Sequence, residues 1–185
     1  APQHRFLLAH VAQGLADAEL AKRGFDAGSS RQAENSALLL EMAIAIDRSW
    51  TSGFRAAQDL SRLLHLLKWA AEDTLIRTRT AEGYAHYALY PESYLHSARR
   101  SGLSADTLVI GLRSIGIGLA AMVAAALGAR PAISLRPVGD PFGRRVRASP
   151  CLIEAAASMH GIHFAIVDEG PGLSGSSFAA VVRWL

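Results

Sequence analysis

Residues 163–178 read His163-Phe-Ala-Ile-Val-Asp168-Glu169-Gly170-Pro-Gly172-Leu173-Ser174-Gly175-Ser176-Ser177-Phe178. An apolar run of strand character ends in two adjacent carboxylates, and a loop of small residues then leads into a helical pattern. Carboxylates can accept hydrogen bonds from ribose hydroxyls, and the exposed N–H groups of a loop and a helix start can surround a phosphate. The stretch therefore predicts a strand–loop–helix unit suited to a phosphorylated sugar.

The same alternation of strand and helix extends upstream of this stretch. Three apolar runs have strand character and two helical patterns separate them: strands at 107–110, 132–136 and 163–167, helices at 117–127 and 151–159. Short apolar strands that alternate with helices predict an α/β fold with a parallel sheet covered on both faces. Ligands of such sheets bind at the carboxyl ends of the strands, which are here Gly111, Pro137 and Asp168.

The beginning of the chain predicts helices rather than strands. Apolar residues recur at helical spacing over 6–20, Gly24 is a plausible stop, and Ser30 is a candidate N-cap for a second helix. A third helical pattern extends over 60–76. We therefore expect two parts, a helical N-terminal region at 1–80 and an α/β domain at 84–185.

An aromatic-rich segment, residues 84–94, stands between these two parts. Its sequence is Tyr84-Ala-His-Tyr87-Ala-Leu-Tyr90-Pro91-Glu-Ser-Tyr94, which predicts a short strand or an irregular stretch. Two interpretations stay open at this point. The rings either form a packed seam that joins the two parts, or a hood that stacks on a flat base.

Composition and charge narrow the class of protein. Half of the 185 residues are apolar and 19% are charged, as is typical of a globular protein, and the net charge is only +3. This small excess is a weak sign of nucleic-acid binding and fits an anionic small molecule equally well. The single cysteine, Cys151, excludes an internal disulfide and fits a reducing compartment.

A membrane location is not expected from the sequence. The apolar run over 108–127 is about as long as a membrane span, but it contains Arg113 and several glycines. The first residues lack the features of a signal peptide. We therefore expect a cytoplasmic protein whose apolar run is a buried strand, a turn and a buried helix.

The carboxylate pair and the loop after it resemble the phosphoribosyl-pyrophosphate motif of type I phosphoribosyltransferases. That motif has an apolar strand, two acidic residues, a short spacer and then Thr/Ser-Gly-x-Thr/Ser at a helix start, here Ser174 to Ser177. The glycine-rich turn at 110–120 looks like the pyrophosphate loop of orotate-type members. The basic stretch at 136–147 lies where the family has a mobile catalytic loop. The resemblance covers residues 84–185, and its three loops follow the family order.

The resemblance implies roles for named residues. Asp168 and Glu169 would hold the ribose hydroxyls, while Arg113, Arg144 and Arg145 would neutralise the pyrophosphate. Phosphate and pyrophosphate contacts are implied for two sets, namely Gly111, Arg113, Ser114 and Gly116 after the first strand, and Gly170, Gly172, Leu173, Ser174, Gly175, Ser176 and Ser177 after the third. Mg²⁺ on the pyrophosphate is implied as well, with Asp168 and Glu169 as its indirect partners.

Each loop also has a simpler interpretation. The turn at 110–120 can be a close-packed connection that uses glycine for fit, and the loop at 136–147 can be a solvated basic loop or a contact to acidic RNA or protein. The sequence also departs from the family. The spacer at 170–173 is about one residue longer than usual, Ile115 replaces a frequent lysine, and the chain ends one helix after the motif. We therefore expect the α/β domain to be incomplete at its carboxyl end.

The function implied by the resemblance is transfer of a phosphoribosyl group to a nitrogenous base or related acceptor, with release of pyrophosphate. Such an enzyme acts on small molecules and often forms a homodimer. Two alternatives stay open: a non-catalytic module that senses phosphoribosyl pyrophosphate or nucleotides, and a helical interaction scaffold in which the motif is structural.

Overall fold

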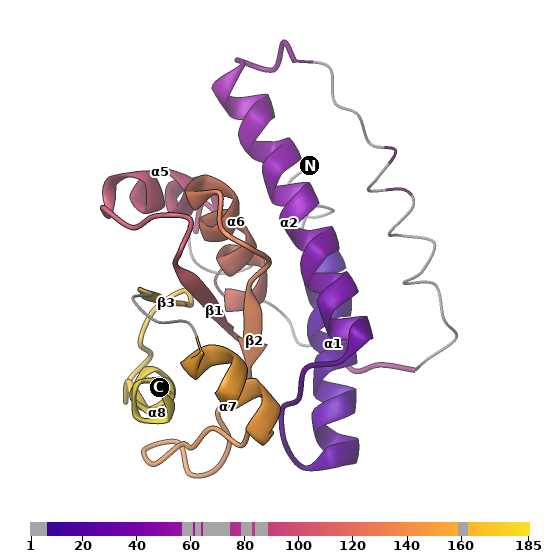
Figure 1. Cartoon of the computed structure of the whole chain (residues 1–185), viewed down its shortest axis with the longest axis vertical. Coiled ribbons are helices and arrows are strands. Elements are labelled where there is room, and N and C mark those ends of the chain that lie inside the picture. Colours follow the sequence, from indigo (N-terminus) through magenta and orange to yellow (C-terminus); the bar gives the residue numbers. More distant parts are fainter. Residues whose placement is uncertain are drawn as a thin grey trace.

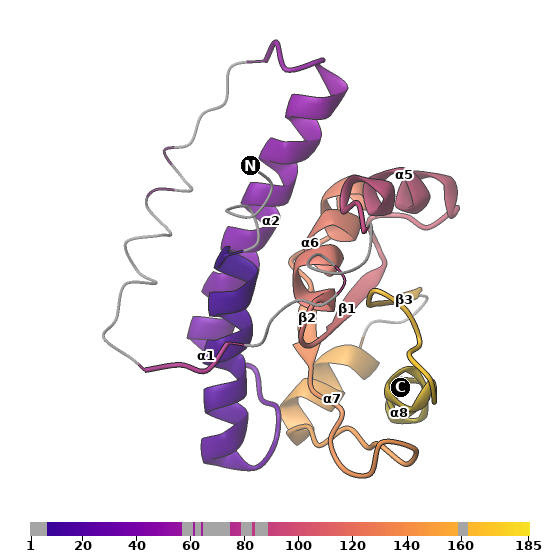
Figure 2. The ribbon, with the colours of Figure 1, turned by 180° about the vertical axis from the view of Figure 1, so that it is seen from behind.

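A parallel sheet of three strands lies at the centre of the described part of the chain (Figures 1 and 2). The computed structural model describes residues 7–56, 61, 64, 75–78, 83, 89–158 and 163–185. The strands are β1 (Leu108–Leu112), β2 (Ile133–Leu135) and β3 (Phe164–Val167), arranged in the order β2-β1-β3. Ile110 of β1 is in register with Ile133 of β2 and with Ile166 of β3. The predicted α/β class with a parallel sheet is confirmed.

Helices cover both faces of this sheet, as the apolar strands require. Val109 of β1 packs in one cluster with α6 (Gly116–Leu127) and with Ala98 of α5 (Glu92–Arg100). Successive side chains of a strand point to opposite faces, so Leu108, Ile110 and Leu112 face the other side. There they pack with Val181 of α8 (Ser176–Trp184) and with Leu152 of α7 (Pro150–Ala157). The predicted strands and helices of this part are confirmed to within a few residues.

Two long helices form the N-terminal region, α1 (Leu7–Arg23) and α2 (Ser30–Thr51). Gly24 follows α1 with φ +81°, as the predicted stop requires. The N-cap of α2 is Ser29, whose hydroxyl accepts a hydrogen bond from the Gln32 N–H at 3.1 Å, rather than its neighbour Ser30. Both helices share one apolar cluster with α5 and α6, in which Ala12 and Ala43 meet Ile117 and Met122. The helical region therefore packs directly on the α/β part.

Two local predictions are wrong. Residues 75–78 are not helical, although the third helical pattern includes Leu75 and Ile76; most of that pattern lies outside the described residues. Tyr94 lies in helix α5, although the aromatic segment predicts a strand or an irregular stretch. Pro91 and Glu92 start this helix, because proline has the right φ for a first turn and an acidic side chain favours its positive end. Tyr84 and Tyr87 lie outside the described residues.

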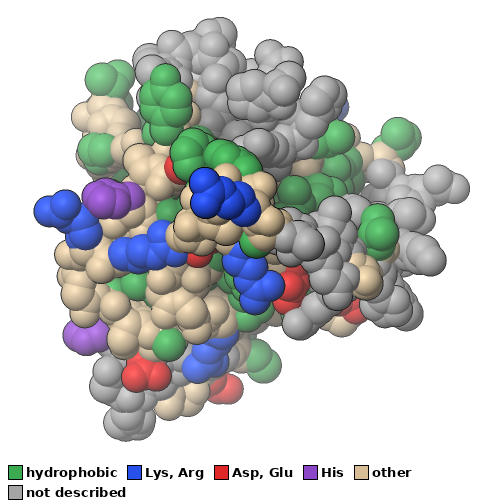
Figure 3. All heavy atoms as spheres, turned by 90° about the horizontal axis from the view of Figure 1, so that it is seen from above, with side chains coloured by type: hydrophobic (Ala, Val, Ile, Leu, Met, Phe, Trp, Pro, Cys, Tyr) green, Lys and Arg blue, Asp and Glu red, His purple; other side chains and the backbone are tan. Residues whose placement is uncertain are grey.

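The surface charges are mixed rather than segregated on the face seen in Figure 3. Lys and Arg side chains alternate there with acidic, histidine and apolar ones. Helices α5 and α2 are joined by an ion pair, in which the Arg99 guanidinium lies 2.5 Å from the Asp47 carboxylate. In the described part of the chain, no helix has the length and apolarity that a membrane crossing requires.

Candidate functional site

The carboxyl ends of β1 and β3 meet at the start of helix α6. A Cβ on Gly116 would overlap the carbonyl oxygen of Val167, the last residue of β3. A Cβ on Gly111 would lie 2.7 Å from the Gly116 carbonyl oxygen and 3.0 Å from the Ala120 side chain. Both glycines thus serve close packing, and that packing also brings the first N–H group of α6 to the end of β3. The interpretation as a tight turn and the interpretation as a ligand loop are therefore compatible.

Asp168 occupies the junction of these two strand ends. Its carboxylate accepts the Glu169 N–H at 2.9 Å and is also stabilised by the Gly116 N–H at the positive end of α6. Burial and, to a smaller extent, the charge of Glu169 raise the pKa of Asp168 to about 6, while those two N–H groups and Arg136 limit the rise. A half-buried carboxylate without a direct ion pair in the described residues is a typical feature of a functional position.

Tyr94 is a residue of this site that the sequence motifs do not identify. Its hydroxyl donates a hydrogen bond to the main-chain carbonyl of Asp168 at 2.8 Å. Burial and the nearby charges of Asp168 and Glu169 raise the pKa of Tyr94, so the phenol stays protonated and keeps its donor role. For this ring the packed seam is the better interpretation. The side chain of Glu169 itself is exposed and lies against the backbone of Gly83.

The loop between β3 and α8 depends on two glycines with left-handed backbone angles, Gly172 at φ +63° and Gly175 at φ +62°. Gly175 is the N-cap of α8, and its missing side chain leaves the start of that helix without a side-chain cap. Leu173 is fully exposed, whereas Gly170 and Ser177 are half-buried. The loop thus presents a helix start with small residues, which is the geometry that favours anions.

The serine hydroxyls of this loop are in contact with the basic loop that follows β2. Ser174 and Ser176 both donate hydrogen bonds to the Pro141 carbonyl, at 2.8 and 2.5 Å. Ser176 is buried, and its N–H donates to the Ser174 hydroxyl at 3.3 Å. The second and third of the predicted loops are therefore brought together, and a carbonyl oxygen occupies the position where a phosphate oxygen is expected.

Arg113 is placed in the interior, away from solvent. Its side chain is 0% exposed and forms ion pairs with Asp26 and with Asp17, the latter at 3.1 Å. It also donates to the Ser134 carbonyl at 3.2 Å. A contact with pyrophosphate would require Arg113 to leave both carboxylates, so the geometry gives it a structural role instead of the implied one. Ser114 beside it is half-buried.

The other two implied arginines remain on the surface loop after β2. Arg144 is half-buried and donates to the Pro137 carbonyl at 3.2 Å. Arg145 has an exposed side chain, and its main chain forms two 2.9 Å hydrogen bonds with Val138. These bonds close the loop into a small hairpin that carries both guanidinium groups. Arg144 and Arg145 therefore both lie on the second of the three predicted loops.

The acidic residues of the site do not form a complete metal centre by themselves. No group of three or more His, Cys, Asp and Glu side chains in the described residues has the geometry to hold a metal ion. Asp168 and Glu169 provide two carboxylates, which suits a Mg²⁺ ion that takes most of its ligands from substrate phosphates and water. A metal fits this site only together with such a substrate.

Comparison with known proteins finds no match for this chain. No protein-family model matches the chain, and no curated protein or solved structure shows significant similarity to it.

Proposed function

We propose that this protein binds phosphoribosyl pyrophosphate at the carboxyl end of β3 and transfers its phosphoribosyl group to a nitrogenous base or related acceptor, as a type I phosphoribosyltransferase-like enzyme. The observation that carries this proposal is the meeting of three strand-end loops. The Asp168 carboxylate of the third loop accepts a hydrogen bond from the Gly116 N–H of the first loop. Ser174 and Ser176 of the third loop donate hydrogen bonds to the Pro141 carbonyl of the second. This is the strand-end edge where ligands of parallel sheets bind.

Each part of this edge has a chemical task in the proposal. The carboxylates of Asp168 and Glu169 accept hydrogen bonds from the ribose hydroxyls, and the start of α8 receives the 5′-phosphate. Arg144 and Arg145 neutralise the leaving pyrophosphate and, with their hairpin, exclude water from the reacting carbon. Mg²⁺ bound to the pyrophosphate supplies further positive charge.

The buried ion pairs of Arg113 favour a second candidate, a non-catalytic module that senses the same ligand. Binding requires the two carboxylates and the start of α8, where Ser174 and Ser176 would exchange the Pro141 carbonyl for a phosphate oxygen. Turnover requires cations on the leaving group, and Arg113, one of the three implied arginines, is buried and paired with Asp17 and Asp26. Both candidates predict binding, and only the first predicts release of pyrophosphate.

The binding test compares two double variants that remove the same charge. Calorimetry with phosphoribosyl pyrophosphate and Mg²⁺ should show saturable binding to the wild type and a loss of at least about tenfold for Asp168→Asn/Glu169→Gln. The control Asp106→Asn/Glu154→Gln changes two exposed carboxylates elsewhere and should bind as the wild type does. Equal affinity of both double variants would contradict the site.

The catalytic test measures pyrophosphate release with a panel of purine, pyrimidine and pyridine bases. Turnover that is lost in Arg144→Gln/Arg145→Gln supports the transferase. Binding without turnover for any base supports the sensor.

A further inference from the structure

A separate cavity of about 550 Å³ lies between helix α1, residues 75–78 and the loop after β2. Gln13, Asp17 and Ala18 of α1 form one wall, and Pro137, Val138 and Arg144 form the opposite wall. Residues 75–78 run beside α1 in both views of the ribbon (Figures 1 and 2) and add Leu75 and Arg77. Residues Asp168 to Ser177 do not line this cavity, and it shares only Arg144 with the proposed substrate site.

A close backbone approach holds this cavity in shape. A Cβ on Gly14 would lie 3.0 Å from the Arg77 carbonyl oxygen and 3.0 Å from the Ile76 side chain, so a larger residue at position 14 would force this segment to shift. This contact fixes Leu75 and Arg77 along the rim. The cavity therefore results from specific packing of two segments about sixty residues apart.

The charges around the cavity leave two arginines without an acidic partner. Asp17 is the acidic residue of the lining, and it is bonded to Arg136 at 2.9 and 2.5 Å. Arg144 donates to a main-chain carbonyl, and neither Arg144 nor Arg77 forms an ion pair within the part of the chain that is described. Two positive charges thus face an open, partly apolar space, which is the electrostatic requirement for an anion.

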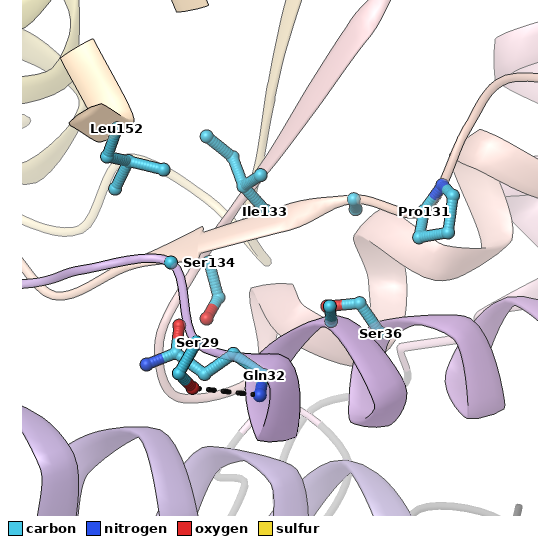
Figure 4. A pocket seen from close by; sticks show the side chains of 10 residues that line it. Ser29, Gln32, Ser36, Pro131, Ile133, Ser134 and Leu152 are labelled. Carbon is cyan, nitrogen blue, oxygen red and sulfur yellow. Dashed lines mark hydrogen bonds between the residues drawn. The ribbon is translucent and has the colours of Figure 1, made fainter. Parts of the chain in front are cut away.

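A second cavity among the described residues lacks this combination. It measures about 280 Å³ and lies between the start of α2, β2 and α7 (Figure 4). Ile133 and Leu152 give it an apolar lining, and two of its polar residues, Ser29 and Gln32, are already bonded to Glu19. It offers no charge to an anion, because no Lys or Arg lines it.

We propose that the cavity beside α1 binds a small organic anion, whose carboxylate or phosphate is held by Arg77 and Arg144 and whose apolar body lies on Ala18, Leu75 and Val138. The volume is within the range of roughly 300–1,000 Å³ that is typical of small-molecule sites. Planar guanidinium groups suit both oxyanions, since each can donate two parallel hydrogen bonds to carboxylate or phosphate. Arg144 also belongs to the proposed phosphoribosyl site, whereas Arg77 lines this cavity alone, so Arg77 is the residue that tests the assignment.

Calorimetric titration of the full chain with benzoate and with phenylphosphate tests the proposal and identifies the preferred oxyanion. At least one probe should bind saturably, and Arg77→Gln should weaken that binding about tenfold because one charge-assisted contact is lost. Ala18→Phe should abolish binding by filling the space, since Ala18 is exposed on α1 and the fold accepts a larger side chain there. Arg55→Gln is the matched control, an exposed arginine outside the cavity.

Three outcomes would overturn the assignment. The first is that neither probe binds. The second is that both cavity variants bind as tightly as the Arg55→Gln control. The third is phenylphosphate binding that survives Arg77→Gln but is lost in Gly175→Ala, because that result would place the anion at the start of α8 instead.

Discussion

Acidic side chains are buried in two regions of this protein, with opposite surroundings. Near the ends of β1 and β2, Asp17 and Asp26 are paired with the guanidinium groups of Arg113 and Arg136. At the end of β3, Asp168 is half-buried with only N–H groups as direct partners. Both regions follow strand ends, yet the first neutralises its charges internally and the second leaves one uncompensated. The difference separates a structural cluster from a candidate binding site.

The paired cluster is a junction between distant segments of the chain. The Asp26 carboxylate accepts the Arg136 N–H at 2.9 Å, and its main chain bonds to Arg147 and Ser149 on the far side of the basic loop, both at 2.7 Å. Hydrogen bonds from Arg136 and Gln13 and the charges of both arginines outweigh burial and hold the pKa of Asp17 below its ordinary value. The α1–α2 connection is thereby fixed to two strand ends.

The largest expected effect comes from breaking the paired region. Arg113→Met should lower the free energy of unfolding by about 3–5 kcal/mol, because Asp26 would remain buried without its cation. Urea denaturation of the variant against wild type measures this loss. Arg145→Met is the control, since that side chain is exposed and should change stability by less than about 0.5 kcal/mol. Similar losses in both variants would show that the cluster does not carry the stability assigned to it.

Substitution of the carboxylate in the unpaired region should raise the free energy of unfolding instead of lowering it. Burial raises the pKa of Asp168 from 3.8 to about 6, so the folded state holds its proton more tightly than the unfolded state does. Stability contributed by this group is therefore full below pH 4 and falls as the pH rises to about 6. Asp168→Asn should stabilise the protein by about 1–3 kcal/mol at pH 7.5, and this gain should vanish near pH 4.

Thermal or urea unfolding at both pH values checks this prediction. Asp17→Asn sharpens the comparison: the pKa of Asp17 is lowered, so its contribution is full at neutral pH and is lost only as the pH falls through that lower value. A destabilising Asp168→Asn substitution at pH 7.5 would place Asp168 among the structural carboxylates.

The smallest effect is expected at the contact between the two regions. Ser176→Ala removes the hydrogen bond to the Pro141 carbonyl and should cost about 1 kcal/mol of stability. Amide exchange of Gly143, in the hairpin next to Pro141, should accelerate in this variant. Ser177→Ala is the control, because the hydrogen bonds to the Pro141 carbonyl come from Ser174 and Ser176. Unchanged exchange in Ser176→Ala would mean that the hairpin is held by its own main-chain bonds alone.

Much of the fold could be predicted because its signals are local. The strand at 163–167, the helix closed by Gly128 and the Ser149-Pro150 helix start each depend on residues within one turn or one strand. The order of the glycine-rich, basic and acidic loops can likewise be read directly from the sequence. These features determined the α/β class and the edge of the sheet where a ligand is expected.

The tertiary structure decided which charged residues are available at that edge. Arg113 stands in a glycine-rich turn and has the sequence context of a ligand-binding residue, yet its partner Asp26 lies 87 residues away. Tyr94 joins the site through a carbonyl 74 residues away. Partners this distant in sequence leave no local pattern, because only packing brings them within hydrogen-bond reach. The sequence alone thus determined where the loops lie, and only the folded chain decided which of their side chains still face a ligand.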